Sequence, residues 1–205
     1  MLKKDNMIDF DLILELQKSC IAAWHTEVKL TQTELPWKYI EENNYYNFLL
    51  WHEEDIARIK DIDPLRIVEA KRNIDKFNQL RNNAIEKIDE WILTFLAVSN
   101  DVKLPMHSET PGMMMDRLSI MALKRYHMFE ETVRPGASDE HKSKCSYKVS
   151  VLDEQIDDLA DCLRNILQLL SLGKLKFKVY RQFKMYNDPE LNPQLYKRTP
   201  LKIVK

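Results

Sequence analysis

The scarcity of glycine is the feature that most restricts the fold of this chain. Glycine supplies only 3 of 205 residues, Gly112, Gly136 and Gly173, or about 1.5% where about 7% is usual. Each lies beside the end of a predicted helix. Nucleotide-binding folds with Gly-rich phosphate loops need two or three glycines close together, and all-β folds need many tight turns. The sequence therefore disfavours both classes and favours an all-α fold.

Proline, glycine and capping residues divide the chain into five predicted helices, over about residues 9–30, 38–60, 63–99, 112–133 and 150–172. Asp63 followed by Pro64 is typical of a helix start, and no further proline or glycine occurs before Pro105. We predict an all-α, single-domain bundle of about five helices over residues 1–205. Its parts are an N-terminal helix and linker (1–39), a helical core that carries the motifs (40–173) and a basic extended tail (174–205).

The last predicted helix has the clearest amphipathic pattern. Its apolar residues recur at spacings of three and four, as on one face of a helix; they are Leu152, Ile156, Leu159, Leu163, Ile166 and Leu170. Ser150 and Asp153 resemble a capping box, which places the helix start near Ser150. Gly173 marks its end.

The tail, residues 174–205, carries nine Lys or Arg and two acidic residues. Lysines 174, 176 and 178 alternate with apolar residues, a period-2 pattern that indicates an extended stretch. Two interpretations fit this segment. The tail docks on the acidic helical part of the chain, or Lys178, Arg181 and Lys184 bind phosphate.

Charge and cysteine content restrict the partners and the compartment. The net charge is −1, so no overall field points to nucleic acid or to a membrane surface. The longest apolar run, residues 91–98, is too short to span a membrane, and acidic residues near the start break any signal-peptide pattern. The three cysteines have no metal-ligand spacing. We expect a cytoplasmic protein with no membrane span and no nucleic-acid partner.

The third predicted helix carries polar residues where its apolar stripe should continue. Arg81 occupies a stripe position, and an unpaired buried charge is costly. Asn78, Asn82 and Asn83 lie close to it, although asparagine is a poor helix-interior residue. This cluster forms either a hydrogen-bond network between helices or a polar patch that faces a ligand.

The second and fourth helices repeat this anomaly. His52 and Asp55 share a face that is otherwise apolar, with Arg58 three residues further on, and the fourth helix places Asp116, His127 and a glutamate on one face. Facing helices commonly build sites in the core of a bundle, so we expect these groups to meet inside it.

Metal binding is an alternative for the same residues. Iron–carboxylate bundles need Glu-x-x-His twice, and here the order is reversed, as His52-x-x-Asp55 and His127-x-x-Glu130. Glu86-x-x-Asp89 resembles the paired acids of helical Mg²⁺-dependent pyrophosphatases. We assign no metal ligands and predict no cofactor, and a divalent metal remains the alternative.

The loop before the fourth helix, residues 106–112, places Ser108, Glu109 and Thr110 beside a helix N-terminus. The bare amide groups of such an N-terminus favour an anion such as phosphate. Capping of the helix by Ser108 or Thr110 accounts for the same residues.

Four stretches of the chain resemble a bacterial family, domain-of-unknown-function family 4254. They are Asn44 to Arg58; Asn78-Gln79-Leu80-Arg81-Asn82; Ser108 to Gly112, continuing through Asp116-Arg117-Leu118-Ser119 to His127-Met128; and Tyr180 to Pro189. The sequence departs from the family pattern at Asn83, where aspartate is expected, and at His107, where asparagine is expected. The resemblance implies an association with glycosyltransferases and lipopolysaccharide assembly, and hence a role in cell-envelope glycan synthesis.

These observations lead to one functional hypothesis and two alternatives. The protein binds or acts on a phosphorylated sugar or nucleotide sugar; alternatively it is a non-catalytic adaptor for a glycosyltransferase, or a metal-dependent phosphohydrolase of the helical-bundle type. His52 or His127 would be the general acid or base, oriented by Asp55, Glu109 or Asp116. The predicted substrate-binding residues are Arg58, Asn78, Arg81, Asn82, Ser108, Arg117, Arg181 and Lys184.

Overall fold

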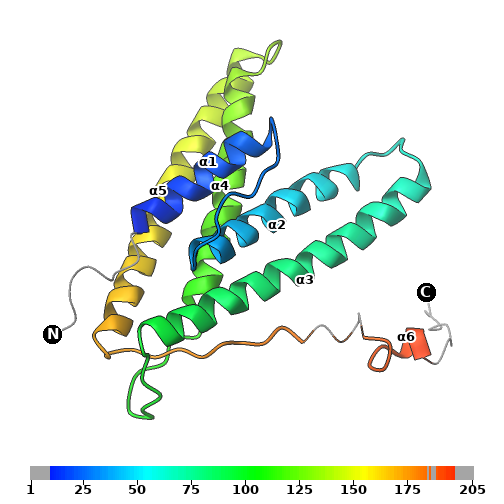
Figure 1. Ribbon diagram of the computed structural model, residues 1–205. Coiled ribbons are helices and arrows are strands. Elements are labelled where there is room, and N and C mark those ends of the chain that lie inside the picture. Colours follow the sequence, from blue (N-terminus) through cyan, green and yellow to red (C-terminus); the bar gives the residue numbers. More distant parts are fainter. Residues whose placement is uncertain (1–9, 184, 186–187, 197–205) are drawn as a thin grey trace, which may run out of the picture.

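The computed structural model is all-α and describes residues 10–183, 185 and 188–196 (Figure 1). The described helices are α1 (Phe10–Trp24), α2 (Trp37–Ile56), α3 (Pro64–Phe95), α4 (Pro111–Val133), α5 (Asp139–Ser171) and the short α6 (Pro193–Tyr196). The described residues contain no strand, only one isolated parallel β-bridge between Met106 and Lys176. The predicted fold class, an all-α helical bundle, is confirmed.

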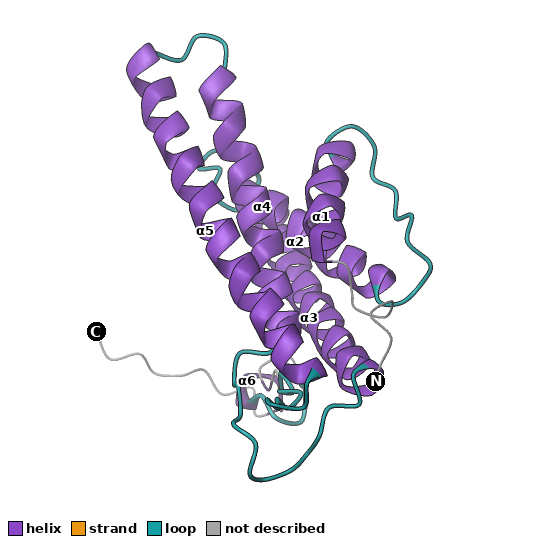
Figure 2. Ribbon diagram, turned by 90° about the vertical axis from the view of Figure 1, so that its left-hand side faces the viewer, coloured by secondary structure: helices purple, strands orange, loops and turns teal. Residues whose placement is uncertain are grey.

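Two antiparallel helical hairpins form the molecule. Helices α2 and α3 make one hairpin and α4 and α5 make the other, and the two cross steeply (Figures 1 and 2). Helix α1 packs against both α2 and α4. The main apolar core combines residues of all five long helices with the start of the tail; its fully buried members include Ile13, Ile40, Ile88, Met114, Leu118, Leu163 and Phe177.

The helix starts that the sequence marks most clearly are confirmed. The Asp63 carboxylate accepts a hydrogen bond from the backbone N–H of Leu65 at 2.9 Å and so caps α3. The Thr110 hydroxyl accepts one from the N–H of Met113 at 3.2 Å and caps α4. Capping satisfies amide groups that have no partner within the helix.

Helix α5 begins at Asp139, eleven residues earlier than Ser150, the predicted start, and Ser138 is its N-cap. The Ser138 hydroxyl accepts a hydrogen bond from the N–H of His141 at 3.2 Å, and Asp139 and Glu140 suit the positive end of the helix. Ser150 lies inside the helix, where its hydroxyl donates to a backbone carbonyl. The prediction was wrong because the earlier cap continues into an uninterrupted helix, while the predicted apolar series beyond Leu152 is buried as expected.

Helix α1 ends at Trp24, not near Leu30 as predicted. In the linker that follows, several backbone groups form hydrogen bonds with side chains and not with one another as in a helix. The buried Glu41 carboxylate accepts hydrogen bonds from the N–H groups of Thr31 and Gln32 at 2.8–3.0 Å, and the Trp24 indole donates to the carbonyl of Lys29 at 3.0 Å. These contacts pull the linker back onto α1 and α2.

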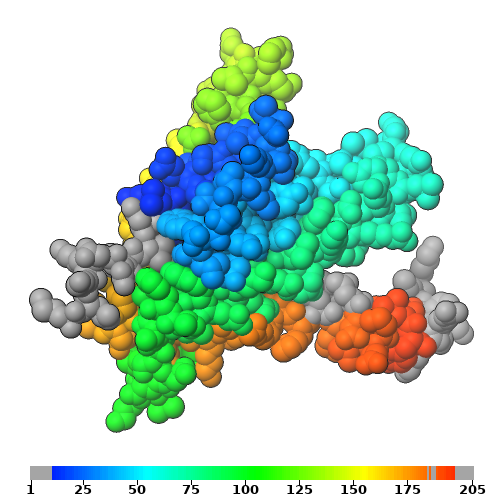
Figure 3. Space-filling model, viewed as in Figure 1, coloured from blue at the N-terminus to red at the C-terminus, as the bar shows by residue number. Residues whose placement is uncertain are grey.

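Residues 174–183, the described start of the tail, are extended, as predicted, and follow the underside of α3 in the view of Figures 1 and 3. Leu175 and Phe177 are buried, as the period-2 pattern predicts. Lys176 is buried as well, although the same pattern predicts that it is exposed. The Lys176 ammonium group donates to the backbone carbonyl of Asp101. Further along, Arg181 donates to the carboxylates of Glu86 and Glu90 on α3.

None of the described helices combines the length and the apolar character that crossing a membrane requires.

Candidate functional site

A cleft of about 330 Å³ lies between α2, α3 and α4. Four of the predicted site residues line it: Asp55 from α2, Arg58 from the turn just after α2, and Asn78 and Arg81 from α3. Polar groups that are far apart in the sequence therefore meet between helices. Asn47, Trp51 and Glu54 of α2 complete the polar wall, and Ile120 and Leu123 of α4 supply the apolar wall.

Asp116 of α4 lies beside this cleft and is buried. Its Oδ1 atom accepts hydrogen bonds from the side-chain amides of Asn43 and Asn47, each at 2.9 Å. The Arg81 Nε atom is 3.8 Å from the same oxygen, which is too long for a hydrogen bond. Arg81 Nε is buried and has no hydrogen-bond partner among the described residues. The two amides therefore hold Asp116, while part of the guanidinium group of Arg81 remains available.

Three buried asparagines of α2 were missed by the sequence analysis: Asn43, Asn44 and Asn47. Asn44 accepts a hydrogen bond from the hydroxyl of Ser119 at 2.7 Å, and its amide donates to the carbonyl of Gln17 at 3.1 Å. The signal was present, because asparagine inside a helix is as anomalous here as it is near Arg81. In α2 these residues form the internal hydrogen-bond network that joins α1, α2 and α4.

The N-terminus of α4 is already bound to a carboxylate of this chain. Asp89 of α3 accepts hydrogen bonds from the N–H of Gly112, at 2.7 Å, and from the Thr110 hydroxyl. Burial raises the pKa of Asp89 to about 7, although the two hydrogen bonds act to lower this pKa. Of the two interpretations of residues 106–112, the geometry matches capping by Thr110, and Ser108 is exposed in the loop.

Other predicted residues lie elsewhere. Glu109 and Arg117 form an ion pair and line a second, larger cleft of about 940 Å³ between α4 and α5. Asn82 is buried in α3 outside the lining of the first cleft, Arg181 is bound to α3, and Lys184 lies outside the described residues. The structure thus brings five of the thirteen predicted residues together, four that line the first cleft and Asp116 beside it.

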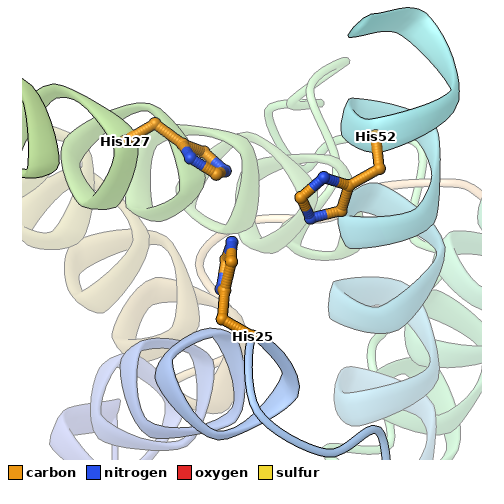
Figure 4. Close-up of side chains that lie close together, drawn as sticks. All are labelled: His25, His52 and His127. Carbon is orange, nitrogen blue, oxygen red and sulfur yellow. The ribbon is translucent and has the colours of Figure 1, made fainter. Parts of the chain in front are cut away.

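His52 and His127, the predicted acid–base candidates, lie close together with a third histidine, His25, just beyond α1 (Figure 4). Burial, followed by the charges of the two neighbouring histidines, lowers the pKa of His52. His25 was not singled out from the sequence, because no acidic residue lies three or four residues away to mark it. Trp51 stacks on His127, with 4.8 Å between ring centroids, and also lines the first cleft.

Comparison with known families gives one match. Residues 37–179 match the family described as "Protein of unknown function (DUF4254)". No curated protein and no solved structure matches the chain.

Proposed function

Because the chain belongs to the DUF4254 family of proteins of unknown function, we propose a function from the geometry of the cleft between α2, α3 and α4. We infer that this cleft binds a phosphorylated sugar. The observation that carries the proposal is the guanidinium group of Arg81, whose buried Nε atom has no hydrogen-bond partner in the described part of the chain. A ligand that accepts this hydrogen bond relieves a cost of about 1–3 kcal/mol.

The lining of the cleft suits the two halves of such a ligand. Arg81 and Arg58, which also donates to the Glu54 carboxylate at 2.6 Å, carry planar N–H donors that match the oxygens of a phosphate. The carboxylates of Glu54 and Asp55 and the amide of Asn78 are partners for sugar hydroxyls. The charges of these two arginines and two acids cancel, which favours a ligand that combines an anionic group with several hydroxyl donors over a bare anion.

The size of the cleft selects within this class. A volume of about 330 Å³ is near the lower end of the roughly 300–1,000 Å³ usual for ligand sites. A monosaccharide phosphate is therefore the preferred ligand, and a nucleotide sugar would leave its nucleotide outside the cleft. If a proton is transferred to or from the ligand in the cleft, Glu54 or Asp55 would carry it, because both carboxylates line the cleft and His52 does not.

The role in cell-envelope glycan synthesis follows from the family resemblance alone and belongs to this proposal. So does the second candidate function, an adaptor for a glycosyltransferase. One observation favours it: the projecting end of the α4–α5 hairpin exposes the large apolar side chains of Phe129, Val133 and Tyr147. Exposed apolar patches often mark protein–protein contacts.

A ligand screen by thermal unfolding, followed by calorimetry, tests the proposal. Sugar phosphates, nucleotide sugars, free nucleotides and inorganic phosphate are compared. A ligand at 100 times its dissociation constant adds about 2.7 kcal/mol to stability, or roughly 5–10 °C for a chain of this size. We expect selective stabilisation by sugar phosphates.

Arginine variants then locate the site. Arg81→Met and Arg58→Met should abolish the shift, and Arg117→Met, which lies in the other cleft, is the matched control. Loss of binding only in Arg117→Met would move the ligand to the cleft between α4 and α5. No shift with any compound would refute the proposal and favour the adaptor, for which a pull-down with a glycosyltransferase is the next experiment.

A further inference from the structure

Three histidines from three separate parts of the chain converge at one point beside α1, α2 and α4. His25 directly follows α1, His52 belongs to α2 and His127 to α4. Figure 4 shows the three rings directed toward a common centre. Each ring offers a nitrogen atom, and these three atoms all lie within 4.8 Å of one another.

The hydrogen bonds of two of these rings leave the inward nitrogen free. The His25 Nδ1 atom is 2.7 Å from the backbone carbonyl oxygen of Ile21. Since a carbonyl only accepts, Nδ1 carries the proton and Nε2 keeps its lone pair in the neutral ring. The His127 Nδ1 atom contacts the Glu130 carboxylate at 3.0 Å in the same way. The Nε2 atoms of His25 and His127 are buried and have no hydrogen-bond partner in the described residues.

This is the arrangement that metal-binding histidines commonly adopt. A ligating histidine almost always donates its second N–H group to a carboxylate or a backbone carbonyl, which sets the tautomer and raises the basicity of the ligating nitrogen. Here His25 has a carbonyl partner and His127 a carboxylate partner. Packing alone does not account for two buried nitrogens without partners, because each costs about 1–3 kcal/mol.

Aromatic neighbours hold the rings in place. His25 stacks on Tyr126, with centroids 4.3 Å apart and an interplanar angle of 19°. His127 stacks on Trp51 at 4.8 Å and 8°. His52 meets the edge of Phe48 at 4.5 Å and 70°. A rigid set of ligands lowers the conformational cost of binding an ion.

We propose that His25, His52 and His127 bind a divalent transition metal of the Zn²⁺ class. Imidazole nitrogens suit Zn²⁺ and its neighbours rather than Mg²⁺ or Ca²⁺, which prefer oxygen. In a tetrahedral zinc site the ligating nitrogens are about 3.3 Å apart, given Zn–N bonds of about 2.0–2.1 Å. The largest separation of 4.8 Å closes to this value through small rotations of the three side chains.

Three protein ligands leave a fourth position for water or another small ligand, as in catalytic zinc sites. All three histidines are partly exposed as residues, whereas the Nε2 atoms of His25 and His127 are themselves buried. His127 and Trp51 also line a largely apolar cavity of about 570 Å³ between α2, α4 and α5. The metal site is distinct from the arginine-lined cleft and does not depend on the proposed function. It assigns ligands to the divalent metal that the sequence analysis left as an alternative without ligands.

Metal titration of the full-length chain tests the proposal. The protein is stripped with a chelator and titrated with Zn²⁺ against a competing indicator, and with Co²⁺, whose visible absorption is strong in four-coordinate and weak in six-coordinate sites. We expect one equivalent per chain, tighter than about 1 µM, and a four-coordinate cobalt spectrum. Weaker or non-stoichiometric binding by the unaltered chain overturns the proposal, whatever the variants do.

Variants then assign the ligands. His25→Gln, His52→Gln and His127→Gln keep side-chain volume close to the original, and each should weaken Zn²⁺ binding by at least about 100-fold. Glu130→Gln should weaken it by about 10–100-fold, as for other partners of ligating histidines. The matched control replaces the two remaining histidines, His107 and His141, and should leave the affinity unchanged. If the control variant loses the metal while the three glutamine variants keep it, the site lies elsewhere and the proposal fails.

Discussion

Replacing Gly112 with alanine tests a close contact between the two helical hairpins. Gly112 lies in the first turn of α4, directly against α3. A Cβ atom added there would be 2.7 Å from the backbone oxygen of Ile85, 2.8 Å from Oδ1 of Asp89 and 3.0 Å from its Cγ. Non-bonded heavy atoms normally pack at about 3.5–4.0 Å. Because one of the obstructing atoms belongs to the backbone, no change of rotamer relieves the contact.

The magnitude follows from what must move. The helices separate by several tenths of an ångström, which costs about 1–3 kcal/mol as overpacking. The same movement lengthens the 2.7 Å hydrogen bond from the Gly112 N–H to Asp89, which adds about 1 kcal/mol. The higher helix propensity of alanine returns at most about 1 kcal/mol. The net expectation is a loss of roughly 1–3 kcal/mol.

Urea unfolding followed by circular dichroism measures this loss. Gly136→Ala is the control, since nothing lies within 4 Å of a Cβ there and only its φ of +78° opposes the change, at about 1 kcal/mol. Gly112→Ala should cost clearly more than this control. A Gly112→Ala protein as stable as the original chain would refute the close packing of α3 against α4.

Three further predictions follow from the polar contacts. Arg81→Met should change stability by less than about 1 kcal/mol, because Asp116 keeps its two amide donors; a loss of about 3–5 kcal/mol in urea unfolding would make the pair structural. Burial raises the pKa of Asp89 from its ordinary 3.8 to about 7, so the folded state binds the extra proton and stability should fall by roughly 2–3 kcal/mol between pH 5 and pH 8. Asp89→Asn should flatten this dependence. If the free energy of unfolding fell equally with pH in both proteins, the prediction would be contradicted. Arg181→Ala removes the ion pairs to Glu86 and Glu90 on α3 and should therefore speed chymotrypsin cleavage of the tail. An unchanged cleavage rate would show that these ion pairs do not hold the tail against α3.

Local signals in the sequence predicted the helices well. Asp63 and Thr110 mark the starts of α3 and α4 through hydrogen bonds that span two or three residues, and the apolar series of α5 defines its buried face. The two errors in helix length have different causes. A side chain from outside the segment, Glu41, ends the helical path after α1, and a second serine cap, Ser138, precedes the predicted start of α5.

The polar cleft was partly predictable. Arg81 and Asn78 stand out because they interrupt an apolar stripe or fit a helix poorly, and Asp55 and Asp116 because they share faces with core residues. The same reasoning applied to α2 would have found Asn43, Asn44 and Asn47. The unusual occurrence of asparagine inside a helix does not tell whether its amide belongs to an internal network, as for Asn43 and Asn44, or faces a cleft, because both arrangements place amides between helices.

The sequence by itself determined that this chain folds into long helices and which side of α5 is buried, because periodicity and capping act over a few neighbouring residues. Only the tertiary structure decided which of those sides meet. The steep crossing of the two hairpins brings α4 against α2 and separates Glu109 and Arg117 from Arg81. It also gathers His25, His52 and His127, which are 27 and 75 residues apart along the chain. Such contacts depend on how side chains pack between helices, and no local pattern in the sequence records that packing.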